Sequence, residues 1–278
     1  MKDMNETGEQ EDIKEEFGIV AMIDALGVSN YNGEESINFL NIFKSIISQN
    51  KKIYEYLESQ EKTYFDSNAM ENVKISKFGD SIIWAWPIED KNSIVNLIIV
   101  HSVAIGLNDI MLRGLFNKIP LRGVISVGKY VWDKEDERLI GRAISEATNW
   151  YNTVDWLGII FTPNADLWLS QQIERNESDI EKAAILNAIN TFICKYQVPL
   201  KDNHNTQNNF EKLFVVGWPV IFHNTKIYDK DKSIAPLSAQ QIFYKLLFDI
   251  PKSEGTESKY ENTKKFFEWY ENEQNNRT

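Results

Sequence analysis

Two aspartates stand where a fold can bring their side chains together. Asp24 directly follows an almost continuous apolar run, residues 17–23, and Asp80 lies in a Gly79-Asp80 pair between two β-rich segments. A buried strand delivers the side chain at its end to a sheet edge, and a two-residue hairpin exposes its turn at such an edge. Two carboxylates meeting there would offer hard oxygen ligands to Mg²⁺ or Mn²⁺. We therefore predict a metal site at Asp24 and Asp80. The simpler alternative is that Asp24 caps a turn and Asp80 satisfies hairpin geometry.

Other chemistry-bearing residue types give weaker signals. Residues 123–130 match the spacing of a phosphate-binding loop only superficially, because Tyr130 replaces the required Ser or Thr and the intervening residues have a strand pattern. The single cysteine, Cys194, lies on an apolar face expected to be helical, which indicates a buried structural thiol. Five tryptophans are expected to pack rather than to stack on a base: Trp84, Trp86, Trp150, Trp156 and Trp168.

Hydrophobic periodicity predicts the elements that would position the two aspartates. The expected strands are residues 17–23, 73–78, 81–86, 121–131, 156–161 and 213–222. The expected helices are residues 35–57, 90–116 with Asp90 or Asn92 as cap, 141–151, 165–193, 239–248 and 260–270, with a polar connection at 63–72. The alternation of strands and helices, without a repeat or a Pro- or Gly-rich linker, favours one α+β domain over residues 17–278. Residues 1–16 are acidic with almost no apolar side chains, so we expect a disordered tail.

The composition is that of a folding globular chain, with 278 residues, 42% hydrophobic and 26% charged. A formal net charge of −11 would repel an extended phosphate backbone, so we expect no nucleic-acid partner. The most apolar stretch, residues 97–107, is too short to cross a membrane, and the acidic N-terminus is unlike a signal peptide. One cysteine and three histidines give neither a disulfide nor a zinc pattern, so we expect a cytoplasmic protein.

Four segments, taken in order, resemble the motifs of the class III nucleotidyl cyclase domain, the family of adenylate and guanylate cyclases. They are Val20-Ala-Met-Ile-Asp24-Ala-Leu-Gly27, Lys77-Phe-Gly79-Asp80-Ser-Ile, Leu121-Arg122-Gly123-Val-Ile-Ser-Val-Gly128 and Leu139-Ile-Gly141-Arg-Ala143-Ile-Ser-Glu146-Ala147. The resemblance covers residues 17–162. It implies a ferredoxin-like βαββαβ core with C-terminal α/β additions in residues 163–278. It also implies a homodimer with active sites at the interface, where Trp150 or Trp156 would be exposed contacts.

The same resemblance assigns roles to both aspartates. In the family, the residues that correspond to Asp24 and Asp80 hold two divalent cations per active site, Mn²⁺ or Mg²⁺. The backbone carbonyl at the position of Ala25 helps to hold one of them. The cations would activate the ribose 3′ oxygen and bind the phosphates of a nucleoside triphosphate.

The chain departs from the purine cyclases where the base is read and the transition state is stabilised. Ser76 and Arg138 stand where purine cyclases carry their base-reading residues, and Ser145 and Asn149 stand where they carry the transition-state Asn and Arg. The chain also resembles the soluble pyrimidine cyclases of the bacterial Pycsar anti-phage systems in size, in lacking sensor domains and in its Gly-Asp-Ser hairpin. That resemblance implies conversion of UTP to cyclic UMP, or of CTP to cyclic CMP, plus pyrophosphate, as an antiviral second messenger.

Three basic residues are candidates to replace the missing arginine: Arg142, which we favour, Lys77 and Arg122. A guanidinium fork matches phosphate oxygens, although a lone cation at a strand end or helix start is usually a solvated charge. The competing hypothesis is a catalytically silent, cyclase-like module that binds a nucleotide and acts through dimer contacts. Loss of both transition-state residues favours this module, whereas retention of both aspartates favours the enzyme.

Overall fold

The computed structural model describes residues 13–28, 31–65, 72–88, 94–176, 183–201, 212–223, 238–250, 252 and 254–275. Within these ranges the chain forms one eight-stranded sheet in the order β2-β3-β1-β4-β6-β8-β7, with β5 paired separately to β4. The strands are β1 Ile13–Ala25, β2 Lys74–Phe78, β3 Ser81–Pro87, β4 Leu121–Asp133, β5 Arg138–Ile140, β6 Ile159–Phe161, β7 Ile193–Tyr196 and β8 Leu213–Val216.

The first four strands form a ferredoxin-like core. Helix α1, Gly33–Phe65, connects β1 to β2, and helix α2, Ile94–Phe116, connects β3 to β4. Strand β1 lies between β3 and β4 and is antiparallel to both. This βαββαβ connectivity, with the strand order β2-β3-β1-β4, confirms the predicted α+β class and its ferredoxin-like core.

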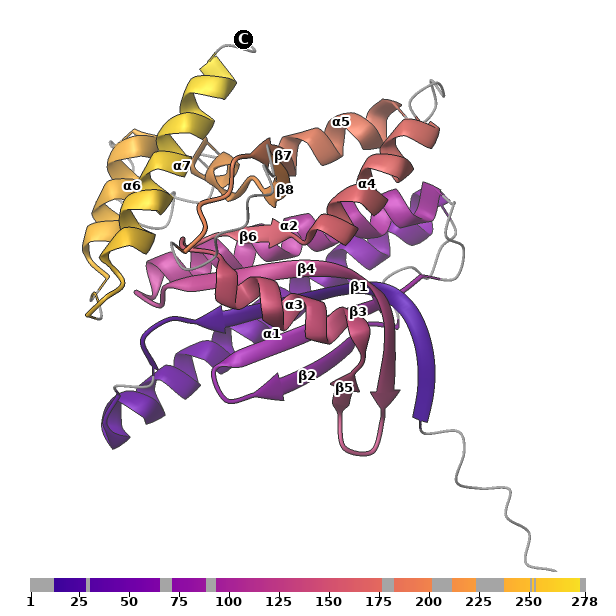
Figure 1. Cartoon of the computed structure of the whole chain (residues 1–278), viewed down its shortest axis with the longest axis horizontal. Coiled ribbons are helices and arrows are strands. Elements are labelled where there is room, and N and C mark those ends of the chain that lie inside the picture. The colour runs from indigo at the N-terminus through magenta and orange to yellow at the C-terminus, as the bar shows by residue number, and fades with distance from the viewer. Residues whose placement is uncertain are drawn as a thin grey trace, which may run out of the picture.

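The two faces of β1 meet different helices. Alternate residues of a strand point to opposite faces, so Val20, Met22 and Asp24 share one face. Helix α3, Arg142–Thr153, lies across that face, in front of the sheet in Figure 1, with α1 and α2 behind it. Val20 packs in a small cluster with Ala143 of α3. Asp24 therefore points toward a helix that follows it by more than a hundred residues.

Helix α2 is central to the packing. It is the one helix in the described ranges that is long and apolar enough to cross a membrane, and 72% of its apolar window is buried inside the protein. It contacts α1 on one side and α4, Pro163–Asn176, and α5, Ala183–Phe192, on another. A helix that is apolar all round fits the core of a large domain.

The C-terminal part continues the same sheet. Strand β8 pairs with β6 and with β7, so residues after 162 share the sheet with the ferredoxin-like core. Helices α6, Ala239–Phe248, and α7, Glu257–Asn275, pack beside the 3₁₀ helix Trp218–His223. Buried aromatic rings hold this region together; they include Trp218, Phe243, Phe266 and Phe267.

Strand β1 begins earlier than the sequence predicted. Residues 13–16, expected in a disordered tail, are the first residues of β1 and pair with the end of β4. Their charges have partners there, because Lys129 Nζ donates to Glu15 at 2.6 Å and the Tyr130 hydroxyl donates to Glu16 at 2.9 Å. Residues 1–12 of the expected tail, and the expected caps Asp90 and Asn92, lie outside the described residues.

Three further expectations differ from the structure. Cys194 lies in β7 opposite Val215, not on a helix, because residues 193–196 pair with β8. The strand expected over residues 213–222 ends at Val216, where the 3₁₀ helix follows. The strand expected over residues 156–161 begins at Ile159, and Trp156 is fully buried against Phe266. Trp156 is therefore not an exposed interface residue.

Candidate functional site

The hairpin brings Asp80 beside Asp24. Asp24 is opposite Ser81 in the β1–β3 register, and Ser81 directly follows the turn. The Ala25 N–H donates to the backbone carbonyl of Asp80 at 3.3 Å, which fixes the turn against the end of β1. Gly79 has φ of 60°, a left-handed conformation that glycine adopts without strain. The sequence prediction that the two aspartates converge is thus confirmed at the level of the backbone.

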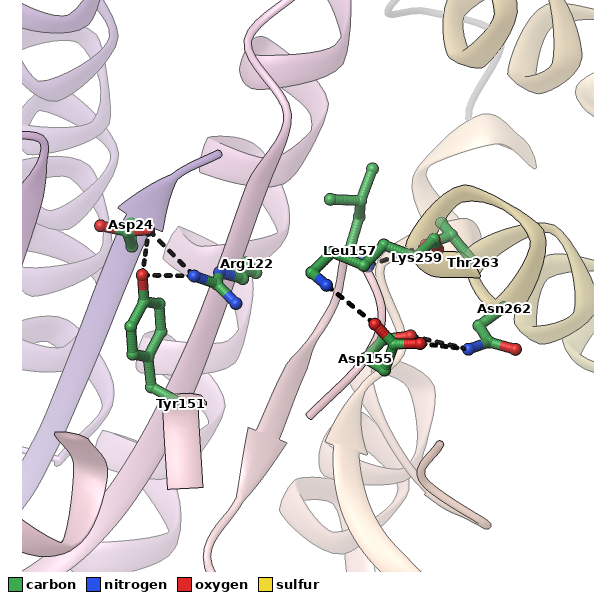
Figure 2. Close-up of polar contacts among 8 residues, drawn as sticks. All are labelled: Asp24, Arg122, Tyr151, Asp155, Leu157, Lys259, Asn262 and Thr263. Atoms are coloured by element: carbon green, nitrogen blue, oxygen red, sulfur yellow. Dashed lines mark hydrogen bonds and ion pairs between the residues drawn. The ribbon is translucent and has the colours of Figure 1, made fainter. Parts of the chain in front are cut away.

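Donors from three elements surround the Asp24 carboxylate, as Figure 2 shows for two of them. The Ser81 hydroxyl donates to Oδ1 at 2.6 Å, and the Tyr151 hydroxyl, from α3, donates to Oδ2 at 2.5 Å. Arg122 of β4 lies with Nη2 3.7 Å from Oδ2. Its guanidinium stacks 4.0 Å from the centre of the Tyr151 ring, and Nη2 donates to the Tyr151 hydroxyl. Asp24 is 5% exposed, so these groups replace most of its water.

The electrostatics of the site favour the binding of a cation. Burial raises the pKa of Asp24, and the nearby charge of Asp80 raises it further, while Ser81, Tyr151 and Arg122 act in the opposite direction. Burial and the bond to Asp24 raise the pKa of Tyr151, so its hydroxyl remains a donor. Two carboxylates that repel each other in a buried setting are stabilised by a bound cation.

The donor atoms fit a hard divalent cation. Asp24 and Asp80 supply carboxylate oxygens, and the carbonyl of Ala25 supplies a backbone oxygen, the ligand types that Mg²⁺ and Mn²⁺ take. In the described part of the chain no three His, Cys, Asp or Glu side chains gather into a metal-binding group. A cation held here would therefore keep coordination positions for water or for phosphate oxygens. Each Asp24 oxygen already accepts one hydrogen bond and has capacity for a second partner.

The predicted base-reading and phosphate-binding residues fall into different places. Ser76 and Lys77 lie on β2 close to the hairpin turn, Ser76 half-buried and Lys77 exposed. Arg138 begins β5, is opposite Asp133 and forms an exposed ion pair with Asp136 at 3.1 Å. Asp133 and Arg122 are at opposite ends of β4, which spans roughly 35 to 40 Å at the usual rise per residue. Within one chain, Arg138 and Asp24 are not brought together.

The three predicted catalytic residues lie together on the exposed side of α3. Arg142, Ser145 and Asn149 line a hollow of about 320 Å³. A neighbouring hollow of about 560 Å³ shares Arg142 and continues to Lys129. The Ser145 hydroxyl donates to the carbonyl of Gly141 at 3.1 Å. Arg142 and Tyr151 are about 13 Å apart along the helix axis at 1.5 Å per residue, so Arg142 is separate from Asp24.

Tyr151 and Ser81 are the site residues that sequence reasoning missed. Ser81 directly follows Asp80, and a strand register that places it opposite Asp24 is the signal that identifies it. Tyr151 carries a weaker signal, the last aromatic residue of an amphipathic helix whose other end follows Gly141. Only the packing of α3 across β1 and β4 brings its hydroxyl to Asp24.

The sequence matches no protein-family model and is not detectably similar to any curated protein. Among solved structures, the chain is similar to the catalytic core of a rhodopsin-guanylyl cyclase with converted specificity in complex with ATPαS, at 10% identity and a TM-score of 0.42, covering 74% of this chain and 98% of that one. It is similar to the guanylyl cyclase Cya2 at 12% identity and a TM-score of 0.36, covering 73% and 91%. It is also similar to a class III adenylyl cyclase-like ATP-binding protein from Pseudomonas aeruginosa at 14% identity and a TM-score of 0.38, covering 64% and 40%. At these identities and TM-scores, neither membership of a family nor an activity follows from the likeness.

Proposed function

We propose that this protein is a nucleotidyl cyclase that converts a pyrimidine nucleoside triphosphate, UTP in preference to CTP, into a 3′,5′-cyclic monophosphate and pyrophosphate. The single observation that carries the proposal is the convergence of Asp24 and Asp80 at the end of β1 in a ferredoxin-like core. In the reaction the ribose 3′ oxygen bonds to the α-phosphorus, the bond to pyrophosphate breaks, and the hydroxyl proton leaves to solvent.

Two groups of residues in this chain would have different roles in the reaction. Asp24, Asp80 and the Ala25 carbonyl would hold two Mn²⁺ or Mg²⁺ ions. When bound, such ions lower the pKa of the attacking hydroxyl and neutralise phosphate charge. Ser81 and Tyr151 orient the Asp24 carboxylate by hydrogen bonds to its two oxygens. The Arg142 guanidinium would stabilise charge on the transferred phosphoryl group.

A second copy of the chain would complete the site. Arg142, Ser145 and Asn149 line one hollow along α3, and Arg142 begins the helix whose other end carries Tyr151 beside Asp24. If two chains pair about a two-fold axis, each α3 can face the aspartate pair of the other, which gives two equivalent sites. Ser76, which replaces a longer base-reading side chain beside the hairpin, offers a hydroxyl that suits hydrogen bonding to a pyrimidine edge. We further propose that the cyclic nucleotide acts as an antiviral messenger in the cytoplasm.

The second candidate function is a silent module that binds nucleotide without turning it over. The observation that favours it is the crowding of Asp24, whose two oxygens already accept bonds from Ser81 and Tyr151 with Arg122 beside them. In this case the polar network would hold β1, β4 and α3 together as a structural feature.

Product analysis separates the two. Purified protein is incubated with ATP, GTP, CTP or UTP and Mn²⁺, and products are identified by mass, for the parent and for Asp24→Asn and Asp80→Asn. Glu135→Gln, an exposed acid in the β4–β5 turn, is the matched control. We expect a cyclic pyrimidine monophosphate from the parent and the control only. Absence of any product from a folded, dimeric parent would favour the silent module, and a cyclic purine product would overturn the pyrimidine assignment.

A further inference from the structure

A short segment, residues 153–157, leads from the end of α3 toward strand β6. Tyr151 lies in the last turn of α3, which ends at Thr153. The Tyr151 hydroxyl donates to Asp24 Oδ2 at 2.5 Å. A hydrogen bond between two oxygens spans about 2.5 to 3.0 Å, so a displacement of the helix end by about 1 Å would break it. The placement of residues 153–157 therefore decides whether Tyr151 reaches Asp24.

Polar side chains of helix α7 hold this segment. The Leu157 N–H donates to the Thr263 hydroxyl oxygen at 2.8 Å. The Asn262 side-chain amide donates to the Asp155 carbonyl at 2.8 Å, and Lys259 forms an ion pair with the Asp155 carboxylate at 2.8 Å. Figure 2 shows these residues in one view with the candidate site. Residues at i, i+3 and i+4 share one face of a helix, so α7 presents all three side chains to the segment together.

Residues 199–201 hold the same segment through the backbone. The Asp155 N–H donates to the Pro199 carbonyl at 2.9 Å, and the Lys201 N–H donates to the Thr153 carbonyl at 3.0 Å. Main-chain groups make these bonds, so the bonds depend little on which side chains stand there. The contacts of α7 come from side chains, so single substitutions can remove them one at a time.

The polar face of α7 is buried, which is unfavourable for polar side chains unless they have partners. Thr263 is fully buried, and Lys259 is 7% exposed. Phe266, on the same face, packs edge-on against Trp156 with 4.7 Å between the ring centres. Apolar contacts of this kind can attach a helix by themselves, whereas a buried ion pair adds little net stability. Hydrogen bonds depend on direction, so the polar contacts of α7 serve to fix the course of the segment.

We propose that three residues of α7 are positioning residues for the candidate site: Lys259, Asn262 and Thr263. They hold the end of α3 where the Tyr151 hydroxyl reaches Asp24. They bond to the segment after α3 rather than to Asp24, so they act through the helix. The inference rests on the proposed function in treating Asp24 as a metal ligand. It adds that the C-terminal helix controls access to the carboxylate oxygen that a cation would use.

Matched substitutions separate hydrogen bonding from packing. Thr263→Val keeps the shape of the side chain and removes the hydroxyl, whereas Thr263→Ser keeps the hydroxyl. Lys259→Met removes the charge and keeps a long side chain, whereas Lys259→Arg keeps the charge. One control is Thr191→Val, because this exposed threonine on α5 also donates to the carbonyl four residues earlier. The other is Lys264→Met, which removes a partly exposed ion pair with Glu268 on α7.

The first measurement follows Tyr151 itself in protein without metal or nucleotide. The tyrosines are replaced by 3-fluorotyrosine during expression, and the fluorine resonance of Tyr151 is assigned by its absence from Tyr151→Phe. We expect this resonance to shift in Thr263→Val and in Lys259→Met. It is expected to keep its parental position in Thr263→Ser, in Lys259→Arg and in both controls.

The second measurement is the affinity for Mn²⁺ in calorimetry. We expect Thr263→Val and Lys259→Met to bind Mn²⁺ about threefold more tightly than the parent, because a displaced Tyr151 hydroxyl no longer occupies an oxygen of Asp24. In a Tyr151→Phe background the same substitutions are expected to cause no further change, because the group through which they act is absent.

Three results would overturn the proposal. The first is a Tyr151 resonance that neither Thr263→Val nor Lys259→Met moves in the folded protein. The second is a shift of equal size in Thr263→Ser and Thr263→Val, which would assign the effect to packing. The third is a change in Mn²⁺ affinity that is the same with and without the Tyr151 hydroxyl. The fluorine measurement uses neither metal nor nucleotide, and cyclase activity is measured by product formation, so the failures of the two proposals are distinguishable.

Discussion

At the residue scale, the Tyr151 hydroxyl is bonded to a carboxylate oxygen that a cation at Asp24 would also use. It donates to Asp24 Oδ2 at 2.5 Å. We expect Tyr151→Phe to bind Mn²⁺ about fivefold more tightly in calorimetry, because roughly 1 kcal/mol of hydrogen bonding no longer opposes the ion. The same variant is expected to lose about 1 to 3 kcal/mol of unfolding free energy, since Asp24 and Arg122 each lose a buried partner.

The control for Tyr151→Phe is Tyr244→Phe. The Tyr244 hydroxyl also donates to a carboxylate, Glu268, at 2.6 Å, but on α6 and α7. We expect this variant to leave Mn²⁺ affinity unchanged. Weaker Mn²⁺ binding by Tyr151→Phe would mean that the tyrosine positions Asp24 for the ion rather than opposing it.

A residue of the site can be predicted from the sequence when local rules place it there, and cannot be when tertiary packing does. Asp24 and Asp80 are predictable because one ends a buried strand and the other lies in a two-residue turn, so local rules place both at a sheet edge. Tyr151 is not predictable in this way, because its contact with Asp24 depends on how α3 crosses the sheet. Arg122 was a candidate for phosphate, but its pairing with Tyr151 is likewise a product of tertiary packing.

At the element scale, Gly141 sets the start of α3 and hence the place of Arg142. Its φ is 135°, and a Cβ added there would lie 2.8 Å from the Cα of Tyr130. We expect Gly141→Ala to lower the free energy of unfolding by about 1 to 3 kcal/mol in urea titrations. Gly128→Ala is the matched control on β4, because its added Cβ would meet Ala143 at 3.6 Å, an ordinary contact. Equal stability of the two variants would show that α3 can begin without the glycine conformation.

The ion pair between Asp155 and Lys259 attaches α7 to the segment before β6. Burial raises the pKa of Asp155, but hydrogen bonds from Lys259 and Ser258 outweigh it, so the pKa is lowered overall. A carboxylate with a lowered folded-state pKa stabilises the protein above its unfolded pKa, about 3.9. That contribution is lost as the pH falls through the folded-state value.

We therefore expect Asp155→Asn to be less stable than the parent at about pH 6, with the difference shrinking below about pH 4 as the parent's carboxylate is protonated. Urea unfolding of both proteins across this range measures the difference. Asp136→Asn, in an exposed ion pair with Arg138, is the control and is expected to differ little from the parent at any pH. A stability difference for Asp155→Asn that does not change with pH would contradict the assignment.

Helices and strands were predicted most accurately where the hydrophobic pattern continues over more than a few consecutive residues. The hairpin with Gly79 and Asp80 in its turn and the strand beginning at Leu121 follow from sequence alone. The short strands β5 and β7 do not, because three or four residues carry too little periodicity to separate a strand from a turn or a helix end. Cys194 was misplaced for this reason, since only pairing with β8 makes its segment extended.

At the scale of the whole molecule, the first four strands form the ferredoxin-like core, and the later strands β6, β8 and β7 extend the same sheet. Periodicity predicted the succession of strands and helices up to β4, whereas the family resemblance implied the ferredoxin-like core, which the strand order confirms. The attachment of β8 and β7 beyond β6 had no sequence signal, because sheet neighbours distant in the chain are chosen by packing. The aromatic cluster around Trp218 shows what drives that packing, namely burial of large side chains between α6, α7 and the sheet.

The division of the candidate site between Asp80 and Arg142 makes a prediction about the proposed dimer. If each active site takes its aspartates from one copy and Arg142 from the other, Asp80→Asn and Arg142→Ala are each inactive, but one of the two sites in a mixed dimer is intact. Random mixing then gives half mixed dimers, so about one quarter of parental activity returns. Mixing is done by co-expression with two affinity tags, and cyclic nucleotide formation is measured on the doubly purified fraction as well.

Asp80→Asn mixed with Asp24→Asn is the control, because both substitutions affect the same half of the site and no mixed dimer has an intact one. Activity restored in this control, or none restored by the first mixture in a verified mixed dimer, would mean that the two groups of residues do not act across an interface. Since α3 separates Arg142 from Tyr151 by about 13 Å within one chain, a single-chain site would then require Arg122 or Lys77, not Arg142, to face the phosphates.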